Sequence, residues 1–150
     1  MCYARFVPPP VGLPIGLHLA RTARTVSRAF DDALAAAGGS LPVWLILISL
    51  KTQRPANQRR LAEAVGIQGA TLTHHLNAME ADGVVTRRPD PTNRRVHLVE
   101  LTEAGEALFH RLRAAAVAFD RQLRAGLADE DVATLAGLLD RLRDNAVGQG

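Results

Sequence analysis

Arginine dominates the chemistry that this sequence offers, and it gathers in the middle third of the chain. The chain has 150 residues and a net charge of +3, and residues 51–97 hold seven arginines and Lys51 against four acidic residues. These arginines form two groups: Arg54, Arg59 and Arg60, then Arg87, Arg88, Arg94 and Arg95. Guanidinium groups pair well with phosphate, so this zone predicts contact with nucleic acid.

Between the two arginine groups lies a segment with one hydrogen-bonding face. Leu72, Leu76 and Met79 are spaced by four and three, which predicts a helix over about residues 68–81 with this stripe turned inward. The opposite side then carries Gln68, Ala70, Thr71, His74, Asn77 and Ala78. An α-helix fits the major groove of DNA, where such short or polar side chains reach base edges and phosphates.

Periodicity and turn residues predict the helices that position this segment. Apolar residues from Ile15 to Leu34 recur every three or four positions, which predicts a helix over 14–38 that ends at two glycines. Ser40 is expected to cap a second helix, apolar nearly all round and therefore buried. Asn57 is expected to cap a third helix, which Gly66 ends.

A β-hairpin with a basic tip is expected next. Val84 and Val85 indicate one strand, and residues 96–101 indicate a second strand, rich in β-branched side chains. Asp90, Pro91 and Asn93 between them are turn residues.

Two amphipathic helices are expected to close the chain. Thr102 can cap the first, and Asp129 can begin the second, whose apolar face is Leu135, Leu138, Leu139 and Leu142. The apolar stripes at the two ends of the chain exceed what one small core covers, which favours a homodimer over packing within one chain. The expected organisation is a flexible tail over 1–13, a dimerisation helix over 14–38, a DNA-binding core over 40–101, dimerisation helices over 102–145 and a frayed end over 146–150.

Two short helices followed by a basic hairpin are the layout of a winged helix-turn-helix, so the expected fold class is mainly α (α+β). The segments 61–63, 71–76 and 79–83 resemble the MarR family of bacterial transcription regulators. The hairpin resembles that family more closely, because Asn93-Arg94-Arg95 is followed after five residues by Leu101-Thr102 and then by Gly105. The resemblance covers about residues 14–145.

This resemblance implies a homodimeric, sequence-specific regulator of transcription, most often a repressor that a small molecule releases. It implies that Arg95 enters the minor groove and that Thr71, Thr73 and His74 touch double-stranded DNA. Two recognition helices about 34 Å apart would meet a pseudo-palindromic operator. The sequence departs from the family pattern at His74, where arginine is common, and at Asn93, which replaces an aspartate thought to hold the wing arginine. Asp90 is a candidate substitute for that acid.

The resemblance also implies a site for a small aromatic or phenolic ligand where the dimerisation and DNA-binding parts meet. Trp44 and Ile48 on the second helix, with His18 and Arg21 on the first, are the candidate ligand contacts. The alternative for Trp44 is a plain core aromatic.

Two other functions remain open. Cys2, beside Tyr3, could make the protein a redox-responsive regulator, although only Arg5 nearby could lower the pKa of the thiol. A winged-helix interaction or ligand-binding module without DNA binding is the other alternative. The five histidines show no metal-binding spacing, so neither a metal nor a cofactor is expected.

Several protein classes are excluded. A single cysteine cannot form an internal disulfide, and no apolar run approaches the ~18 residues of a membrane span. The N-terminus lacks the basic-then-apolar layout of a signal peptide, so a cytoplasmic location without membrane contact is expected. No nucleophile elbow or glycine-rich phosphate loop is present, so the protein is not expected to be an enzyme.

Overall fold

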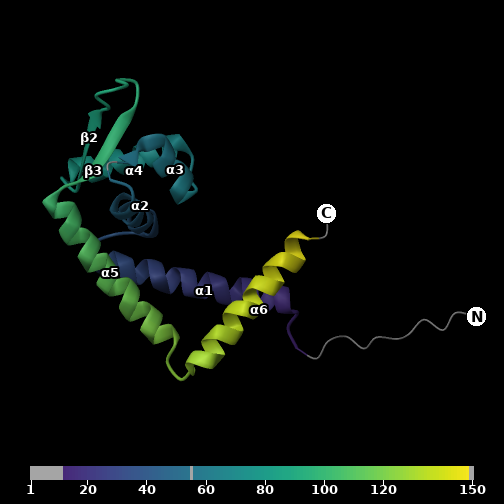
Figure 1. Cartoon of the computed structure of the whole chain (residues 1–150). Coiled ribbons are helices and arrows are strands. Elements are labelled where there is room, and N and C mark those ends of the chain that lie inside the picture. The colour runs from purple at the N-terminus through teal and green to yellow at the C-terminus, as the bar shows by residue number, and fades with distance from the viewer. Residues whose placement is uncertain (1–11, 55, 149–150) are drawn as a thin grey trace, which may run out of the picture.

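The computed structural model describes residues 12–54 and 56–148 and is mostly helical, with one small sheet. Helices α2, α3 and α4 gather with the sheet at one end, and α1, α5 and α6 extend away from it (Figure 1). The helices are α1 (Ile15–Ala36), α2 (Leu41–Thr52), α3 (Gln58–Val65), α4 (Gly69–Ala81), α5 (Glu103–Leu123) and α6 (Asp129–Val147). The strands are β1 (Ala56–Asn57), β2 (Val85–Pro89) and β3 (His97–Leu101).

The predicted caps define the helix ends. Ser40 Oγ accepts a hydrogen bond from the Val43 amide at 3.3 Å, and Asn57 Oδ1 accepts one from the Arg59 amide at 2.9 Å. Gly66 ends α3 with a φ of 75°, in the left-handed region that favours glycine. Thr102 Oγ1 accepts from the Gly105 amide at 3.1 Å and so begins α5.

The sheet is antiparallel in the order β1-β3-β2, so it has one strand more than predicted. β1 pairs Ala56 with Val99, and a two-residue strand is too short to show any periodicity in sequence. β2 and β3 pair from Val85 opposite Leu101 to Pro89 opposite His97. We call this hairpin, residues 85–101, the wing. Each of its strands begins one residue later than predicted, and β2 continues to Pro89, beyond the predicted end at Val85.

One apolar core lies where the helices meet the wing. Leu72, Leu76 and Met79 of α4 are buried in it, which confirms the predicted inward stripe. The other elements contribute Leu34, Ile46, Leu47, Leu50, Ala56, Leu61, Ala62, Val85, Val99, Leu108 and Leu112. The prediction that α2 is buried all round was wrong on one face, where Leu45 and Ile48 are each 36% exposed.

The start of α5 is fastened to the turn that follows α4. Thr102 Oγ1 donates to the Gly83 carbonyl at 2.6 Å, and the Thr102 amide donates to the Val84 carbonyl at 3.1 Å. A side chain at Gly105 would overlap that Val84 carbonyl, so only glycine allows this approach. We call the described part of residues 40–101, with α2, α3, α4 and the sheet, the winged core. The long helix α5 and the winged core therefore meet in a close backbone contact at Gly105.

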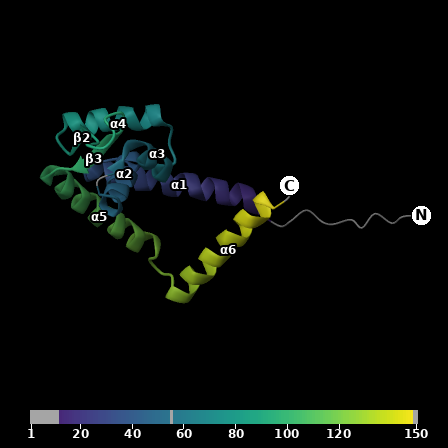
Figure 2. The ribbon, with the colours of Figure 1, turned by 45° about the horizontal axis from the view of Figure 1, so that its top comes forward.

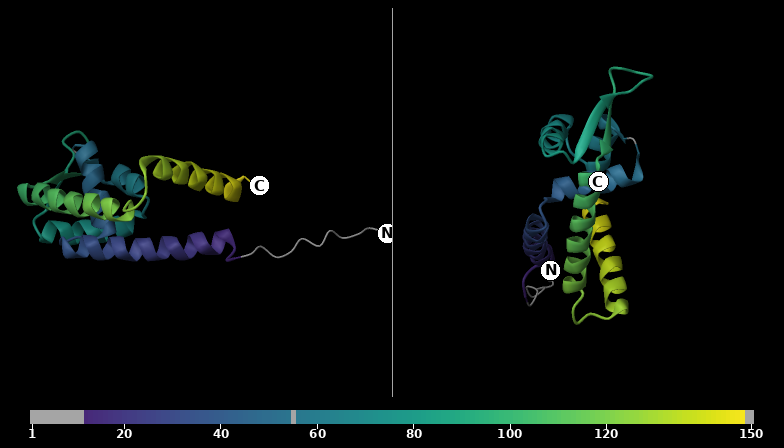
Figure 3. Two further views of the ribbon diagram at one scale, coloured as in Figure 1. Left: turned by 90° about the horizontal axis from the view of Figure 1, so that it is seen from below. Right: turned by 90° about the vertical axis from the view of Figure 1, so that its left-hand side faces the viewer.

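α6 contributes nothing to the core. None of its residues, 129–147, is buried, and Leu135, Leu138 and Leu139 are 40% to 48% exposed. α5 and α6 form a V in which the α6 arm is directed away from the winged core (Figure 2). The view from below also shows α6 apart from the core (Figure 3).

Among the described residues, no single helix has the length and apolar character to cross a membrane. α1 and α2 taken together as a pair, bent by 72°, meet those criteria of length and composition.

Candidate nucleic-acid interface

The outer face of α4 is open to solvent, opposite the buried stripe. Gln68, Ala70, Thr71, His74 and Asn77 are all exposed there, and His75 is half-buried at the boundary. The buried leucines fix the rotation of the helix, and this rotation directs the polar groups outward. The predicted hydrogen-bonding face is therefore one continuous surface.

The tip of the wing is ordered by its own polar side chains. Asp90 Oδ1 accepts from the amide and the hydroxyl of Thr92, both at 2.8 Å, and Asn93 Oδ1 accepts from the Arg95 amide at 3.2 Å. The hydrogen bonds from Thr92 lower the pKa of Asp90. Asn93 thus orders the backbone ahead of Arg95, and Asp90 pairs with Thr92 and not with that arginine.

Arg94 and Arg95 lie in the turn of the wing, and both are exposed and form no ion pair with any described residue. A guanidinium that no carboxylate neutralises keeps its full charge for a phosphate or a narrow minor groove.

Arg87 and Arg88, also predicted to contact DNA, are engaged within the protein. Arg87 Nη2 donates to Asn77 Oδ1 at 2.6 Å and to Glu80 Oε1 at 2.9 Å, and the Arg87 amide donates to Glu80 Oε2 at 3.1 Å. The side-chain hydrogen bond from Arg87 lowers the pKa of Glu80. Arg88 Nη2 donates to Glu100 Oε1, across the wing, at 2.6 Å. These two arginines stabilise the wing and its attachment to α4.

A hollow between α3, α4 and the wing brings predicted residues together. Arg59, Gln68, Thr73 and Arg95 line it, although they come from three separate elements. Gln58 lines it too and donates to Thr73 Oγ1 at 2.9 Å. The sequence prediction missed Gln58, whose only signal was its place just after the Asn57 cap.

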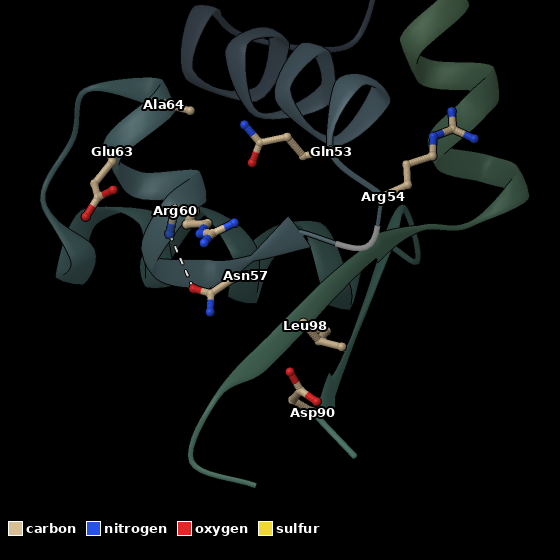
Figure 4. A pocket seen from close by; sticks show the side chains of 8 residues that line it. All are labelled: Gln53, Arg54, Asn57, Arg60, Glu63, Ala64, Asp90 and Leu98. Atoms are coloured by element: carbon tan, nitrogen blue, oxygen red, sulfur yellow. Dashed lines mark hydrogen bonds between the residues drawn. The ribbon is translucent and has the colours of Figure 1, made fainter. Parts of the chain in front are cut away.

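Arg60 lies on a different side of α3 from Arg59. It lines a second, polar groove between α2, α3 and the wing, together with Gln53, Arg54 and Asp90 (Figure 4). The two neighbouring arginines therefore face different hollows, and only Arg59 shares its hollow with α4 and Arg95.

A third cavity lies between α2 and α5. Its aromatic wall consists of Trp44 and Phe109, whose rings stack with centroids 5.5 Å apart. Its remaining lining is Ile48, Lys51, Thr52, Arg113, Ala116, Val117 and Asp120. Trp44 and Ile48 were predicted here, whereas His18 and Arg21 lie exposed on α1 and do not line it.

Two other predictions concern metal binding and Cys2. No group of three potential metal ligands occurs among the described residues. Cys2 lies outside the described residues.

Comparison with known proteins gives consistent matches. Residues 40–97 match the model of the MarR family. A putative transcriptional regulatory protein for the hcr operon of Thauera aromatica is 28% identical over 129 residues, which are 85% of this chain and 78% of that protein.

Solved structures share the fold. A probable transcriptional regulator from Pseudomonas aeruginosa is 30% identical with a TM-score of 0.73, covering 86% of this chain and 96% of its own. A mutant of MarR from E. coli, complexed with operator DNA, has a TM-score of 0.74 at 23% identity, over 87% of this chain and 94% of its own. With its helix-turn-helix, its wing and these relatives, the chain belongs to the MarR family of transcriptional regulators, which are not enzymes.

Proposed function

We propose that this protein is a homodimeric repressor that binds a pseudo-palindromic operator and leaves it when a small aromatic ligand binds. The observation that carries the proposal is that Arg59, Arg95 and the N-terminal end of α4, with Gln68 and Thr73, line one hollow of the winged core. The exposed face of α4 continues from this end of the helix. α4 would read base edges in the major groove, Arg95 would enter the adjacent minor groove, and Arg59 would bind phosphate. The likeness to a MarR structure complexed with operator DNA supports this docking. As a regulator of bacterial transcription it would act in the cytoplasm.

Within the recognition surface, Thr71, His74 and Gln68 are the proposed direct readers of DNA. Asn77 and Thr73 have a second role, because Asn77 accepts from Arg87 and Thr73 Oγ1 both accepts from Gln58 and donates to the Gly69 carbonyl at 2.9 Å. Arg94 and Asn93 complete the wing tip. Arg87 and Arg88 are proposed to act mainly by holding the wing and its attachment to α4, whereas Arg60, which lines the other groove, is proposed to lie away from the DNA-facing side of α3.

Dimerisation is supported by the apolar side chains that the chain leaves exposed at one end. Ile15 of α1 is 64% exposed, and α6 presents three leucines to solvent. An exposed apolar stripe of this extent is typical of a protein interface. A two-fold dimer through α1, α5 and α6 would cover it and present both α4 helices to one face of DNA.

The ligand is proposed to occupy the cavity between α2 and α5, with its ring against Trp44 and Phe109. Two cationic side chains, Lys51 and Arg113, line the same cavity, which favours a ligand with a carboxylate or phenolate group. Binding there would change the spacing of the two recognition helices, provided that one spacing binds the ligand better than the other.

The direct test is fluorescence anisotropy with a labelled duplex from the region upstream of the protein's own gene. A scrambled duplex of equal length is the control, and both are titrated at two salt concentrations. We expect binding about 10³-fold tighter to the upstream duplex at physiological salt. Equal and steeply salt-dependent binding to both duplexes would contradict operator recognition there, and no binding at low salt would favour an interaction module.

A further inference from the structure

The carboxylate of Glu106 joins two cations from a different part of the chain. Its Oε2 accepts from Lys51 Nζ and its Oε1 accepts from Arg54 Nη2, both at 2.7 Å. Glu106 lies in the first turn of α5, Lys51 in the last turn of α2, and Arg54 in the segment between α2 and β1. This one side chain therefore ties the long helix α5 both to the end of α2 and to the segment that joins α2 to β1.

We call the two bonds of Glu106, to Lys51 and to Arg54, the Glu106 tie. Lys51 takes part in this tie and also lines the aromatic cavity between α2 and α5. Its Nζ lies 5.1 Å from the centroid of the Phe109 ring, and the Phe109 ring stacks on Trp44. Lys51 lines the cavity, but Glu106 does not: Glu106 lines a separate hollow with Arg54 and Leu50. The ammonium group thus has a carboxylate partner on one side and an aromatic cavity on the other.

We propose that Lys51 is the cation that recognises the ligand, and that the ligand carboxylate competes with Glu106 for it. This inference rests on the proposed control by a small aromatic ligand and assigns the contact that transmits it. A ring against Trp44 and Phe109 has its acidic group within the reach of Lys51. A carboxylate that leaves water needs such a charge-assisted partner.

Ligand binding would alter the protein because Lys51 would give up its bond to Glu106, which is one of the two bonds that hold α5 to the end of α2 and to the segment after it. Once Lys51 turns to the ligand, Glu106 is held by Arg54 alone. Arg54 borders the polar groove between α2, α3 and the wing (Figure 4). A shift of Glu106 would therefore be passed through Arg54 to the winged core. The ligand would therefore bind more tightly to the state in which Lys51 is released from Glu106 than to the state in which the two are bonded. Such a difference in affinity is what a ligand needs to shift a conformational equilibrium.

Arg113 is the matched control for Lys51. It is a second cation on the cavity wall, and among the described residues it pairs with neither Glu106 nor any other carboxylate. A ligand that used Arg113 alone would bind without disturbing the tie. Lys51 and Arg113 therefore carry the same charge, but only Lys51 is bonded to Glu106.

The experiment uses the fluorescence of Trp44, the only tryptophan of the chain. The probes are benzoate, cinnamate and 2-naphthoate, each paired with its uncharged primary amide, titrated into the full-length protein. We expect at least one carboxylate to bind about tenfold tighter than its amide. In Lys51→Met this preference is lost while the amide still binds, which also shows that the cavity is folded.

Glu106→Gln is expected to raise the affinity for the carboxylate probe, whereas Lys51→Met lowers it. Removing the competing carboxylate frees Lys51, so the carboxylate probe binds about three- to tenfold tighter than to the wild type, with no change for the amide. A purely structural role for Glu106 would weaken both probes. The exchange is overturned if Lys51→Met keeps the carboxylate preference, if Glu106→Gln fails to tighten binding, or if no carboxylate binds.

Measurements of DNA binding test this inference and the proposed function separately. The tightest carboxylate is added to wild type, Arg113→Gln and Glu106→Gln on the upstream duplex. Its effect on the Kd for DNA should persist in the first two and approach a factor of one in Glu106→Gln, where no tie remains to be broken. Persistence of the full effect in Glu106→Gln overturns the exchange. Failure of all proteins to bind the duplex would instead contradict the proposed function, whatever the fluorescence titrations give.

Discussion

The guanidinium of Arg87, on the first strand of the wing, bonds to the carboxylate of Glu80, on α4, at 2.9 Å. The Arg87 backbone amide bonds to the same carboxylate, and the side-chain amide of Asn77 accepts from the same guanidinium. The wing is therefore attached to the recognition helix through several bonds at one point. The two elements that are proposed to enter different grooves of DNA keep a fixed relative orientation.

Breaking this attachment should weaken DNA binding without removing any group that faces DNA. We expect Glu80→Gln to raise the Kd for the upstream duplex about tenfold, because one charge-assisted contact is replaced by a weaker neutral one. Fluorescence anisotropy measures the Kd, and Arg88→Met is the control, since Arg88 pairs with Glu100 inside the wing itself. Equal effects of the two substitutions would mean that the attachment to α4 does not matter for binding.

Arg95→Ala should weaken binding to the upstream duplex by about 10- to 100-fold while thermal stability stays unchanged. The side chain is exposed and unpaired among the described residues, so its loss leaves no buried partner. Parallel anisotropy titrations and thermal melts make the comparison. An affinity equal to that of the wild type would reject the minor-groove role of Arg95.

Arg59→Ala should lower affinity for the upstream and scrambled duplexes alike. A phosphate contact carries no sequence information, and its loss should reduce the slope of log K against log salt by about 1. Arg60→Ala is the matched control, because Arg60 lines the groove on a different side of α3. If Arg60→Ala changes the slope and Arg59→Ala does not, the assignment of the DNA-facing side of α3 is wrong.

Leu139→Asp should convert a dimer into a monomer at micromolar protein concentration. Leu139 belongs to the exposed apolar face of α6, and a carboxylate there would be buried unpaired in the interface. Sedimentation velocity gives the oligomeric state, and Ala133→Asp adds the same charge on the opposite side of α6. A dimer that survives Leu139→Asp would exclude this face of α6 from the interface.

The tie at Glu106 should make stability depend on pH in the acid range. Hydrogen bonding from Lys51, together with the charge of Arg54, lowers the pKa of Glu106 below its usual range. A carboxylate whose pKa is depressed in the folded state contributes stability above its unfolded pKa and loses it as the pH falls through the folded value. The urea midpoint of the wild type should thus exceed that of Glu106→Gln by a constant amount above about pH 5, and the difference should shrink below about pH 4. A difference that is unaffected by pH would contradict an ionic role.

The sequence was sufficient for features set by local chemistry. Ser40, Asn57, Gly66 and Thr102 end or begin helices as predicted, because a cap depends on residues within one turn. The rotation of α4 was predictable for a similar reason, since three core residues at helical spacing leave only one possible outer face. Both strands of the wing were predicted, although β2 was predicted too short, and the third strand of the sheet, β1, was not predicted because it has only two residues.

Long-range pairing was not predictable. Four wing arginines look alike in sequence, yet Arg87 and Arg88 meet carboxylates seven and twelve residues away, whereas Arg94 and Arg95 meet none among the described residues. The cavity needs α2 and α5 side by side, so Trp44 and Ile48 could be proposed from their helix alone but Phe109, Lys51 and Arg113 could not. Charge patterns predict a type of surface, and only the fold decides which charges remain available.

Because its start is bonded to the winged core beside Gly105, α5 acts as a lever arm for that core. Because Thr102 is bonded to the turn after α4, the helix cannot pivot freely where it meets the winged core. Its 21 residues span ~31 Å. A rotation of about 5° at the far end would therefore displace the winged core by about 3 Å, close to the rise of one base pair along DNA. If the protein binds an operator as proposed, small angular changes among the helices at that end would be amplified into a loss of register with the DNA, without any rearrangement of the DNA-facing surface itself.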